Sequence, residues 1–360
     1  MAFLNQVKVC AAHVAPIFLD TRATVEKACL LIREAARSGA KIIAFPETFI
    51  PAFPVWTALG APIHGHDFFR KLAAAAITVP GKEVNEICRT AKANEIIVSI
   101  GINEGTNNSV GCIWNSNLLI GVDGLILNHH RKLVPTFYEK LVWANGDGAG
   151  LRVCETEIGR IGMLICGENT NPLARYAMIA QGEQIHISSF PPIWPTRDPK
   201  ESGRYDLESS IRIRSGAHAF EGKLFNIVVS SVVDDTLKNA LRPLGKEAMR
   251  IIEDSPRGVS MIIGPSGETI GSTLSKDEGL LYGDINLADC VEFKQFHDIA
   301  GYYNRFDIFE LTVNMARTQP IVLNNRTSLD SEQSKQMGDL SIPSDAMPDR
   351  LRMQEKVAGR

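Results

Sequence analysis

The sequence lacks the cysteine spacing of a disulfide framework or a zinc site. It has seven cysteines, an odd number, and no Cys-x-x-Cys pair. Disulfide frameworks are typical of short secreted chains, whereas this chain has 360 residues. His129 and His130 are too close in sequence to form a helical metal pair, and the other histidines are scattered. We therefore expect no metal site. The cysteines among apolar neighbours are expected in the core: Cys10, Cys29, Cys88 and Cys112.

Long apolar runs and nucleotide-binding loops are also missing. No run reaches the roughly 18 apolar residues of a membrane span, no G-x-G-x-x-G follows the first predicted strand, and no Walker-type loop occurs. The net charge is −3 and the basic residues are dispersed, which gives no reason to expect nucleic acid. The first residues lack a charged stretch followed by an apolar signal core. We expect no cofactor, no membrane or nucleic-acid partner, and a cytoplasmic location.

What is present is an alternation of strand and helix patterns in a chain of 44% hydrophobic and 22% charged residues. Strands are expected at 7–15, 41–45, 96–102, 118–122, 125–127, up to 165, 185–188, 224–231, 259–263, 268–272 and 280–285. Helices are expected at 24–37, 82–93, 172–181 and 206–221. Asp123-Gly124 and the turn at 265–267 each join two strands as a hairpin. Interspersed strands, helices and hairpins favour an α/β fold with mixed sheets.

The composition changes only near the C-terminus. No repeat and no Pro/Gly/Ser-rich linker divides the earlier part, so residues 1–310 are predicted to form a single domain. From Leu311 onward there is no Phe, Tyr or Trp, and residues 325–360 are rich in polar residues. Such a segment cannot bury much apolar surface by itself. We predict that 311–360 is a polar C-terminal tail, extended or partly disordered, or docked on a neighbouring subunit.

Cys166 is the first candidate for chemistry. The segment Arg160-Ile-Gly-Met-Leu-Ile-Cys166 predicts a buried strand that ends at the cysteine, and Asn171 and Pro172 then suit the cap and first position of a helix. A thiol just before a helix N-terminus lies near unpaired N–H groups and the positive end of the helix dipole, which favours the thiolate. Alternatively, Cys166 is a small hydrophobe on a buried strand.

Charged residues end two further predicted strands. Pro46 stops the strand at 41–45 and Glu47 follows it, whereas Lys132 follows the 118–127 hairpin and precedes Glu139. Since sites gather at strand ends in α/β sheets, these side chains and Cys166 are expected to converge. The alternatives are a surface carboxylate for Glu47, a solvated basic cluster or an anion site for Lys132, and a helix surface for Glu139.

Aromatic residues in Pro-rich loops after predicted strands are candidates for a substrate cavity. They are Phe53, Trp56, Phe190 and Trp194. Aromatic side chains are equally common as core residues, and that alternative stays open here.

The three segments, taken in this order, resemble the nitrilase superfamily of carbon–nitrogen hydrolases over roughly residues 5–310. The resemblance places the family's Glu-Lys-Cys triad on Glu47, Lys132 and Cys166, and its second, positioning glutamate on Glu139. The runs at 135–148 and 171–176 are similar to the true nitrilase branch. Two segments depart from that branch: glycine instead of tryptophan follows the cysteine, and Gly-Tyr-Tyr replaces Gly-His-Tyr at 301–303. The substrate range therefore stays open.

The resemblance implies a four-layer αββα sandwich that acts on a small-molecule nitrile. The expected reaction converts the nitrile with two waters to a carboxylic acid and ammonia, through a covalent thioimidate and thioester on the cysteine. An amidase with the same triad is the alternative, and a catalytically silent scaffold is another, although scaffolds are expected to lose a triad member. The resemblance also implies a homodimer building block, with two sandwiches stacked, that can extend into larger spiral assemblies.

Overall fold

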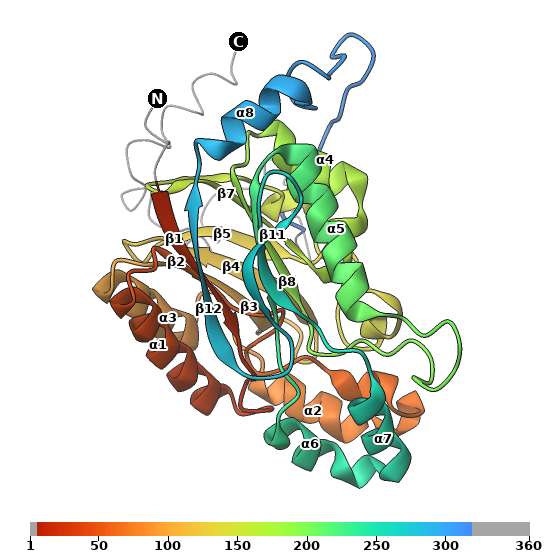
Figure 1. Cartoon of the computed structure of the whole chain (residues 1–360). Coiled ribbons are helices and arrows are strands. Elements are labelled where there is room, and N and C mark those ends of the chain that lie inside the picture. The colour runs from red at the N-terminus through yellow and green to blue at the C-terminus, as the bar shows by residue number, and fades with distance from the viewer. Residues whose placement is uncertain (1–5, 319–360) are drawn as a thin grey trace, which may run out of the picture. The chain divides into compact units, whose positions relative to one another are not determined.

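Two mixed β-sheets form the centre of the protein, and the computed structural model describes residues 6–318 (Figure 1). The first sheet has the order β12 (Gly279–Asn286), β1 (Gln6–His13), β2 (Ile42–Ala44), β3 (Ile97–Gly105), β4 (Ile113–Ile120), β5 (Ile126–Arg131). The second has the order β11 (Thr269–Leu274), β10 (Ser260–Ile263), β9 (Phe225–Ser230), β8 (Ile185–Phe190), β7 (Gly159–Ile165), β6 (Cys154–Thr156). In each sheet a parallel centre is flanked by antiparallel strands.

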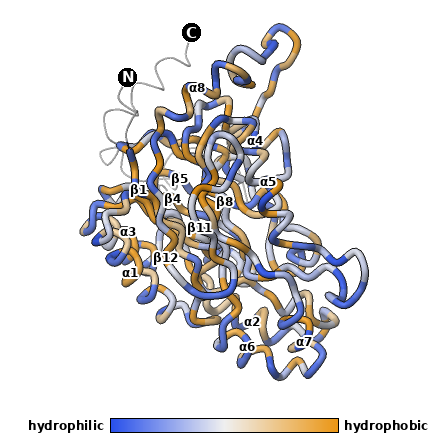
Figure 2. Tube along the Cα trace, in the orientation of Figure 1, coloured by the Kyte–Doolittle hydropathy of each residue, from blue (hydrophilic) through white to orange (hydrophobic). Residues whose placement is uncertain are grey.

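The central strands are apolar on both faces because each face is covered. In β1, Val9 and Ala11 join the cluster between the two sheets, whereas Cys10 and Ala12 face the helices outside. Because successive side chains of a strand point to opposite faces, alternate residues of β1 enter two different apolar cores. Figure 2 shows that hydrophobic residues are frequent along the central strands and hydrophilic ones along the outer turns.

Helices cover the outer face of each sheet. Helices α1 (Thr21–Arg37) and α3 (Lys82–Ala93) pack on the first sheet. Helices α4 (Pro172–Ala180) and α5 (Leu207–Gly222) pack on the second. The layers are therefore helix, sheet, sheet, helix, which confirms the predicted αββα sandwich with mixed sheets (Figure 1).

The long predicted helices agree with the structure to within a turn, and capping explains the main difference. Helix α3 has the predicted bounds, but α1 begins three residues earlier than the predicted start at residue 24. Asp20 is its N-cap, and the Asp20 side chain accepts a hydrogen bond from the Ala23 N–H. Asn171 caps α4 as expected, accepting from the N–H groups of Leu173 and Ala174.

Several short elements were not predicted. They are α2 (His66–Ala75), α6 (Asp235–Leu241), α7 (Lys246–Asp254), α8 (Asp289–Phe296) and the strand β6. Helices this short are marginal on their own and depend on packing. One buried cluster unites Leu72 of α2, Leu237 of α6 and Ile252 of α7 with the aromatic loops after β2 and β5. These three helices lie together at the bottom of Figure 1.

The last described residues run back along the sandwich without regular structure. Arg317 donates a hydrogen bond to the His129 carbonyl at 2.7 Å, and the Thr318 N–H donates to Asp147 at 3.0 Å. The rest of the predicted tail, 319–360, lies outside the described residues. Among the four cysteines expected in the core, Cys10 and Cys29 are buried, but Cys88 on α3 and Cys112 in the loop before β4 are only half-buried. None of the described helices has the length and apolar character to span a membrane.

Candidate active site

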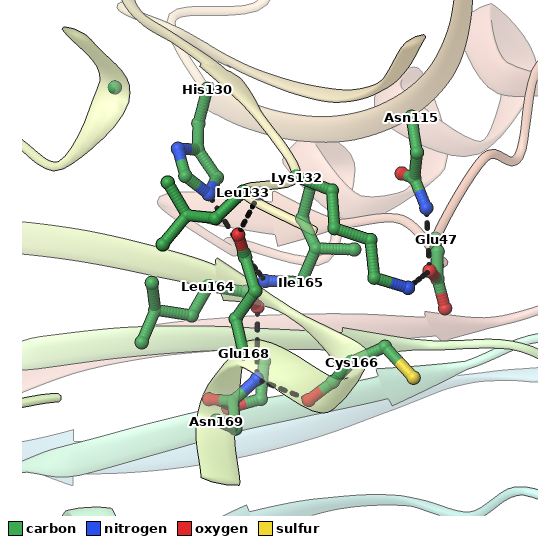
Figure 3. Close-up of polar contacts among 12 residues, drawn as sticks. Glu47, Asn115, His130, Lys132, Leu133, Leu164, Ile165, Cys166, Glu168 and Asn169 are labelled. Carbon is green, nitrogen blue, oxygen red and sulfur yellow. Dashed lines mark hydrogen bonds and ion pairs between the residues drawn. The ribbon is translucent and has the colours of Figure 1, made fainter. Parts of the chain in front are cut away.

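The ends of three strands bring the candidate residues together. Glu47 follows β2, Lys132 follows β5, and Cys166 follows β7 of the other sheet. The Lys132 ammonium donates to Glu47 Oε1 and to Glu139 Oε2, both at 2.7 Å. The Cys166 Sγ and one carboxylate oxygen from each glutamate lie within 4.8 Å of one another. All four residues are buried. Figure 3 shows the Cys166 sulfur directed toward the ends of Glu47 and Lys132.

Glu47 is placed by a tight approach between its turn and β3. The Phe45 N–H donates to the Ser99 carbonyl at 2.8 Å, which continues the sheet to the edge of the turn. Gly101 lies under this turn, and a Cβ on Gly101 would come within 2.4 Å of the Thr48 nitrogen. Asn115 donates to Glu47 Oε1 at 2.6 Å, whereas the buried Oε2 has no hydrogen-bond partner within residues 6–318. One oxygen is thus held and the other is free to accept a proton.

Lys132 and Glu139 form the fixed part of the ion network. The Lys132 backbone N–H donates to the Asn115 carbonyl at 2.8 Å, so the lysine backbone is held in place by β4. Glu139 accepts from the Thr136 N–H at 2.7 Å and from the Trp194 indole N–H at 3.1 Å. Burial opposes the charge on Lys132, but Glu139 and Glu47 outweigh it and raise the lysine pKa well above its ordinary value. Lys132 is therefore an ammonium in the resting site.

Cys166 stands on a sharp turn between β7 and the 3-10 segment Cys166–Thr170. Its φ of 49° is left-handed, a conformation that non-glycine residues adopt only when the surroundings hold it. Glu168 accepts hydrogen bonds from the Ile165 N–H, at 2.8 Å, and the Leu133 N–H, and His130 holds the same carboxylate at 2.8 Å. These contacts tie the cysteine turn to the strand that ends at Lys132 (Figure 3).

The sequence predicted that Cys166, placed before a helix, favours the thiolate form, and this prediction is wrong for the environment that the structure shows. Burial and the Glu47 carboxylate raise the pKa of the Cys166 thiol far above its ordinary value, and Lys132 offsets only part of this rise. The cysteine also begins a 3-10 turn, so the dipole of α4 starts six residues later, at Pro172. Burial raises the pKa of Glu47 to about 7, Lys132 opposes this shift, and Glu139 adds to it. The resting site therefore pairs a thiol with a carboxyl group that titrates near neutral pH.

A cavity of about 510 Å³ opens in front of the thiol. Its lining is Thr136, Cys166, Gly167, Thr170, Trp194, Tyr205, Leu207, Ser210, Ile213 and Arg214. One wall is aromatic, since the Trp194 and Tyr205 rings meet edge to face at 5.0 Å. The glycine that distinguishes this sequence after the cysteine is part of the lining, so no side chain from position 167 fills the cavity.

Only one of the four aromatic candidates lines this cavity. Trp194 does, and it also bonds Glu139, a contact that the sequence did not indicate. Phe53 packs edge to face on Trp143 at 5.4 Å inside the apolar cluster beneath α2, α6 and α7. Trp56 stacks on Phe68 in the same cluster, outside this cavity. Phe190 is fully buried at the end of β8, under Arg214.

Within residues 6–318, two groups of acidic, cysteine and histidine side chains have the proximity of metal ligands. In the first, Glu47, Glu139 and Cys166, the Lys132 ammonium occupies the space between the carboxylates, so a second cation would meet a fixed positive charge. In the second, Glu183, His186 and His218, each histidine already shares a hydrogen bond with the glutamate. Lys132 thus pairs with both carboxylates of the first group, and the members of the second group pair with one another.

Sequence analysis missed residues that position the triad. Asn115 lies in the middle of β4 and looks like any polar strand residue. Glu168 and Asn169 lie two and three residues after the cysteine, so a buried polar pair soon after a buried strand was the available signal. Their roles depend on contacts with strands distant in sequence, which no local pattern encodes.

Comparisons with known proteins agree with this geometry. The family model for carbon–nitrogen hydrolases matches residues 8–295. A nitrilase from Paraburkholderia phymatum is 31% identical over 88% of this chain and 89% of its own length. An arylacetonitrilase from Hypocrea virens is 32% identical over 92% and 98%, and an aliphatic nitrilase from Rhodococcus rhodochrous is 30% identical over 89% and 86%.

The fold has the same relatives. The crystal structure of a carbon–nitrogen hydrolase from Helicobacter pylori superposes with a TM-score of 0.63 at 18% identity, covering 85% of this chain and 97% of the other. The chain belongs to the carbon–nitrogen hydrolase family, in its nitrilase branch, and is a hydrolase of carbon–nitrogen bonds. This finding confirms the resemblance drawn from the sequence.

Proposed function

We propose that the protein is a nitrilase that converts an organic nitrile to its carboxylic acid and ammonia, with Cys166 as nucleophile. The observation that carries this proposal is that Glu47, whose Oε2 has no hydrogen-bond partner among the described residues, lies beside the Cys166 thiol in a buried site that also holds the Lys132 ammonium. A base, a nucleophile and a cation within one enclosed space are what attack on a weakly electrophilic carbon requires.

In the first half of the reaction Glu47 Oε2 takes the thiol proton and the sulfur attacks the nitrile carbon. One bond of the C≡N group opens, and negative charge develops on nitrogen. Lys132, held between two carboxylates, faces this charge and supplies the proton, which Glu47 then restores. The product is a thioimidate on Cys166. Because the thiol starts protonated, the base is essential to this step rather than an accessory.

In the second half water adds to the thioimidate carbon with Glu47 again as base. The tetrahedral species expels ammonia and leaves a thioester, and a second water releases the carboxylic acid and the free thiol. The sum is one nitrile and two waters to one acid and one ammonia. Glu139 acts by holding Lys132 through its own bonds to the Thr136 N–H and Trp194.

An amidase remains the alternative, because the same residues act on an amide carbonyl. The deciding experiment measures ammonia and acid from aliphatic, aromatic and arylacetic nitriles and from the matching amides. Acid from nitriles with little turnover of amides supports the nitrilase. Turnover of amides alone assigns an amidase, and inactivity on the whole panel contradicts both and favours a scaffold.

The activity should fall as the pH drops below about 7. Glu47 must be ionised to accept the thiol proton, and burial raises its pKa to about 7. Since the pKa values of Cys166 and Lys132 lie far higher, neither group produces this acidic limb. The measurement is kcat/KM from pH 5.5 to 9 with a nitrile that has no ionisable group. A profile that stays flat down to pH 5.5 would contradict the role of Glu47 as base.

Replacing Trp194 with phenylalanine should lower kcat more than it raises KM. Phenylalanine still places an aromatic ring in the cavity wall, but Glu139 loses the hydrogen bond from the Trp194 indole N–H at 3.1 Å. A hydrogen bond to a charged group of this kind corresponds to about a tenfold loss in rate. Trp194→Ala, which also removes the aromatic wall, should raise KM as well. Steady-state kinetics of the two variants on one nitrile separate the effects, and an unchanged kcat in Trp194→Phe would refute the contact's importance.

We also propose the homodimer as the building block of the protein. The support is the outer surface of α4 and α5, where Leu173 of α4 and Ile213 and Phe220 of α5 are each more than half exposed. Apolar side chains gathered on one helix layer are typical of a surface that a second copy covers. The mass in solution, measured by light scattering, tests this proposal.

A further inference from the structure

A second buried polar cluster lies behind the nucleophile and takes no part in the chemistry described above. Glu183, His186 and His218 are fully buried between β8 and α5. His186 Nδ1 lies 2.6 Å from Glu183 Oε1, and His218 Nε2 lies 2.8 Å from Glu183 Oε2. The two imidazole rings stack at 3.9 Å. Burying three titratable groups is unfavourable unless they are paired, so their arrangement calls for a functional account.

Asn169 connects this cluster to the nucleophile. Its Nδ2 donates to the Leu164 carbonyl and to the Cys166 carbonyl, both at 3.2 Å. Its Oδ1 lies 3.0 Å from His186 Nε2 and accepts from the Ser188 hydroxyl at 2.9 Å. Figure 3 shows the Asn169 amide spanning the two sides of the cysteine turn. Asn169 is fully buried, so this amide uses both donors and both acceptor positions within the protein.

The orientation of the Asn169 amide determines the protonation of His186. The Leu164 and Cys166 carbonyls can only accept, so the nitrogen of the amide must face them and the oxygen must face His186. His186 Nε2 therefore carries a hydrogen. Nδ1 carries one as well, because it faces the Glu183 carboxylate. His186 is thus an imidazolium, and His218 donates through Nε2 as a neutral ring whose Nδ1 has no partner in the described chain.

The charges of the neighbours agree with this assignment. Burial opposes ionisation of Glu183, but His186 and His218 outweigh it and lower the Glu183 pKa to about 2. Burial and the charge on His186 lower the pKa of His218 to about 4. One carboxylate and one imidazolium therefore form a buried pair, with His218 as a neutral second donor.

We propose that Asn169 and His186 are positioning residues for the nucleophile. The His186 imidazolium, fixed by Glu183, orients the Asn169 amide, and the two N–H groups of that amide hold the backbone of Cys166 in its left-handed conformation. The thiol is thereby presented to Glu47 and Lys132 rather than turned into the sheet. This inference rests on the proposed role of Cys166, and it adds a second layer of residues to that role.

The first test is a double-mutant cycle with Asn169→Asp and His186→Gln. Aspartate keeps the acceptors toward His186 and Ser188 but loses both donors to the cysteine turn. Misplacement of a reacting atom lowers rate by about 100-fold, so kcat should fall to that extent with KM changed much less. His186→Gln should lower kcat by about tenfold. The double variant should be no worse than Asn169→Asp alone, because the histidine acts through the amide.

Two further readouts do not depend on the substrate. The rate at which iodoacetamide alkylates Cys166, followed by mass spectrometry, should fall in the same order as kcat. In protein labelled with ¹⁵N-histidine, the His186 ring should show two protonated nitrogens, with His186→Gln assigning the signal. Altered alkylation in a protein that hydrolyses no nitrile would support the positioning and contradict the nitrilase, so the two proposals are separable.

His13→Gln is the matched control. His13 is a fully buried histidine with a hydrogen bond to Ser260 at 2.8 Å, and within residues 6–318 its side chain shares no hydrogen bond with the cysteine turn or with Asn169. It should lower the melting temperature without changing kcat or the alkylation rate. The positioning role is wrong if His186→Gln lowers kcat and the alkylation rate no more than His13→Gln does. It is also wrong if the effects of Asn169→Asp and His186→Gln on kcat are additive in the double variant. If His186→Gln does not fold, Ser188→Ala removes the other donor to Asn169 Oδ1, and an unchanged alkylation rate there also overturns the proposal.

Discussion

Replacing Cys166 with alanine should abolish hydrolysis while leaving the fold intact. Without the sulfur no thioimidate or thioester forms, so the rate should fall by roughly 10⁴-fold or more. Alanine removes one buried atom, and its neighbours Glu47, Lys132 and Glu139 keep their mutual hydrogen bonds. The free energy of unfolding should therefore change by no more than about 1 kcal/mol. Ammonia release and urea unfolding, measured on the same preparation, check both parts of the expectation.

Cys154→Ala is the control for the loss of a buried cysteine. Cys154 lies on β6 in the apolar cluster between the sheets, away from the cavity. Its replacement should keep full activity. The mechanism fails if Cys166→Ala retains substantial turnover, or if mass spectrometry of wild-type protein mixed with a slow substrate finds the acyl group on any other residue.

Replacing Lys132 with methionine should abolish activity and also destabilise the protein. The ammonium balances two buried carboxylates, and removing one partner of a buried charged network costs roughly 3–5 kcal/mol. Methionine preserves most of the volume, so lost packing contributes little. Urea unfolding at pH 8 gives the loss of stability, and ammonia release gives the loss of activity. Lys140→Met, an exposed neighbour, should change neither quantity.

The destabilisation of Lys132→Met should also depend on pH with a definite sign. The pKa of Glu47 is already raised by burial, and the variant loses the charge that opposes this rise. The folded state then binds a proton that the unfolded state has released above its ordinary carboxyl pKa, so stability decreases as the pH rises through this range. The variant should be closer to wild type in stability at pH 6 than at pH 8. An equal difference at both values would mean that Glu47 does not carry the unbalanced charge.

The candidate triad could be predicted because each member ends a strand whose pattern is visible in the sequence. Glu47 and Cys166 each follow an apolar run, Lys132 follows the hairpin predicted at 118–127, and the ends of these strands, which belong to both sheets, meet at the site. The partners that position them could not be predicted. Asn115 and Trp194 act through side-chain contacts across 68 and 55 residues of sequence, and such contacts depend on register and rotamer rather than on local pattern.

Electrostatics was the weakest part of the sequence-based argument. The helix after Cys166 was correctly predicted, but its dipole is a smaller influence than full burial next to a carboxylate. Burial and close charges are tertiary properties. For the same reason Phe53 and Phe190, which follow predicted strands as Trp194 does, belong to apolar clusters instead of the cavity.

Long helices could be predicted from the sequence more readily than short ones. The long helices α1, α3, α4 and α5 have clear periodicity and recognisable ends, and all were predicted near their true bounds. Helices α6 and α7, seven and nine residues long, exist because their apolar residues complete one shared cluster with α2.

The nucleophile belongs to one sheet, whereas the base and the cation belong to the other. The active site is thus assembled from residues of both sheets, and its geometry depends on how the two sheets are placed relative to each other. A slide of one sheet over the other by about an ångström would separate Cys166 from Glu47 without breaking a strand pair. On mild heating or in low concentrations of urea, hydrolytic activity should therefore be lost before the circular dichroism signal of the secondary structure decreases. Residues such as Met163, which is buried between the sheets and does not line the cavity, then influence activity through the packing of the two sheets against each other.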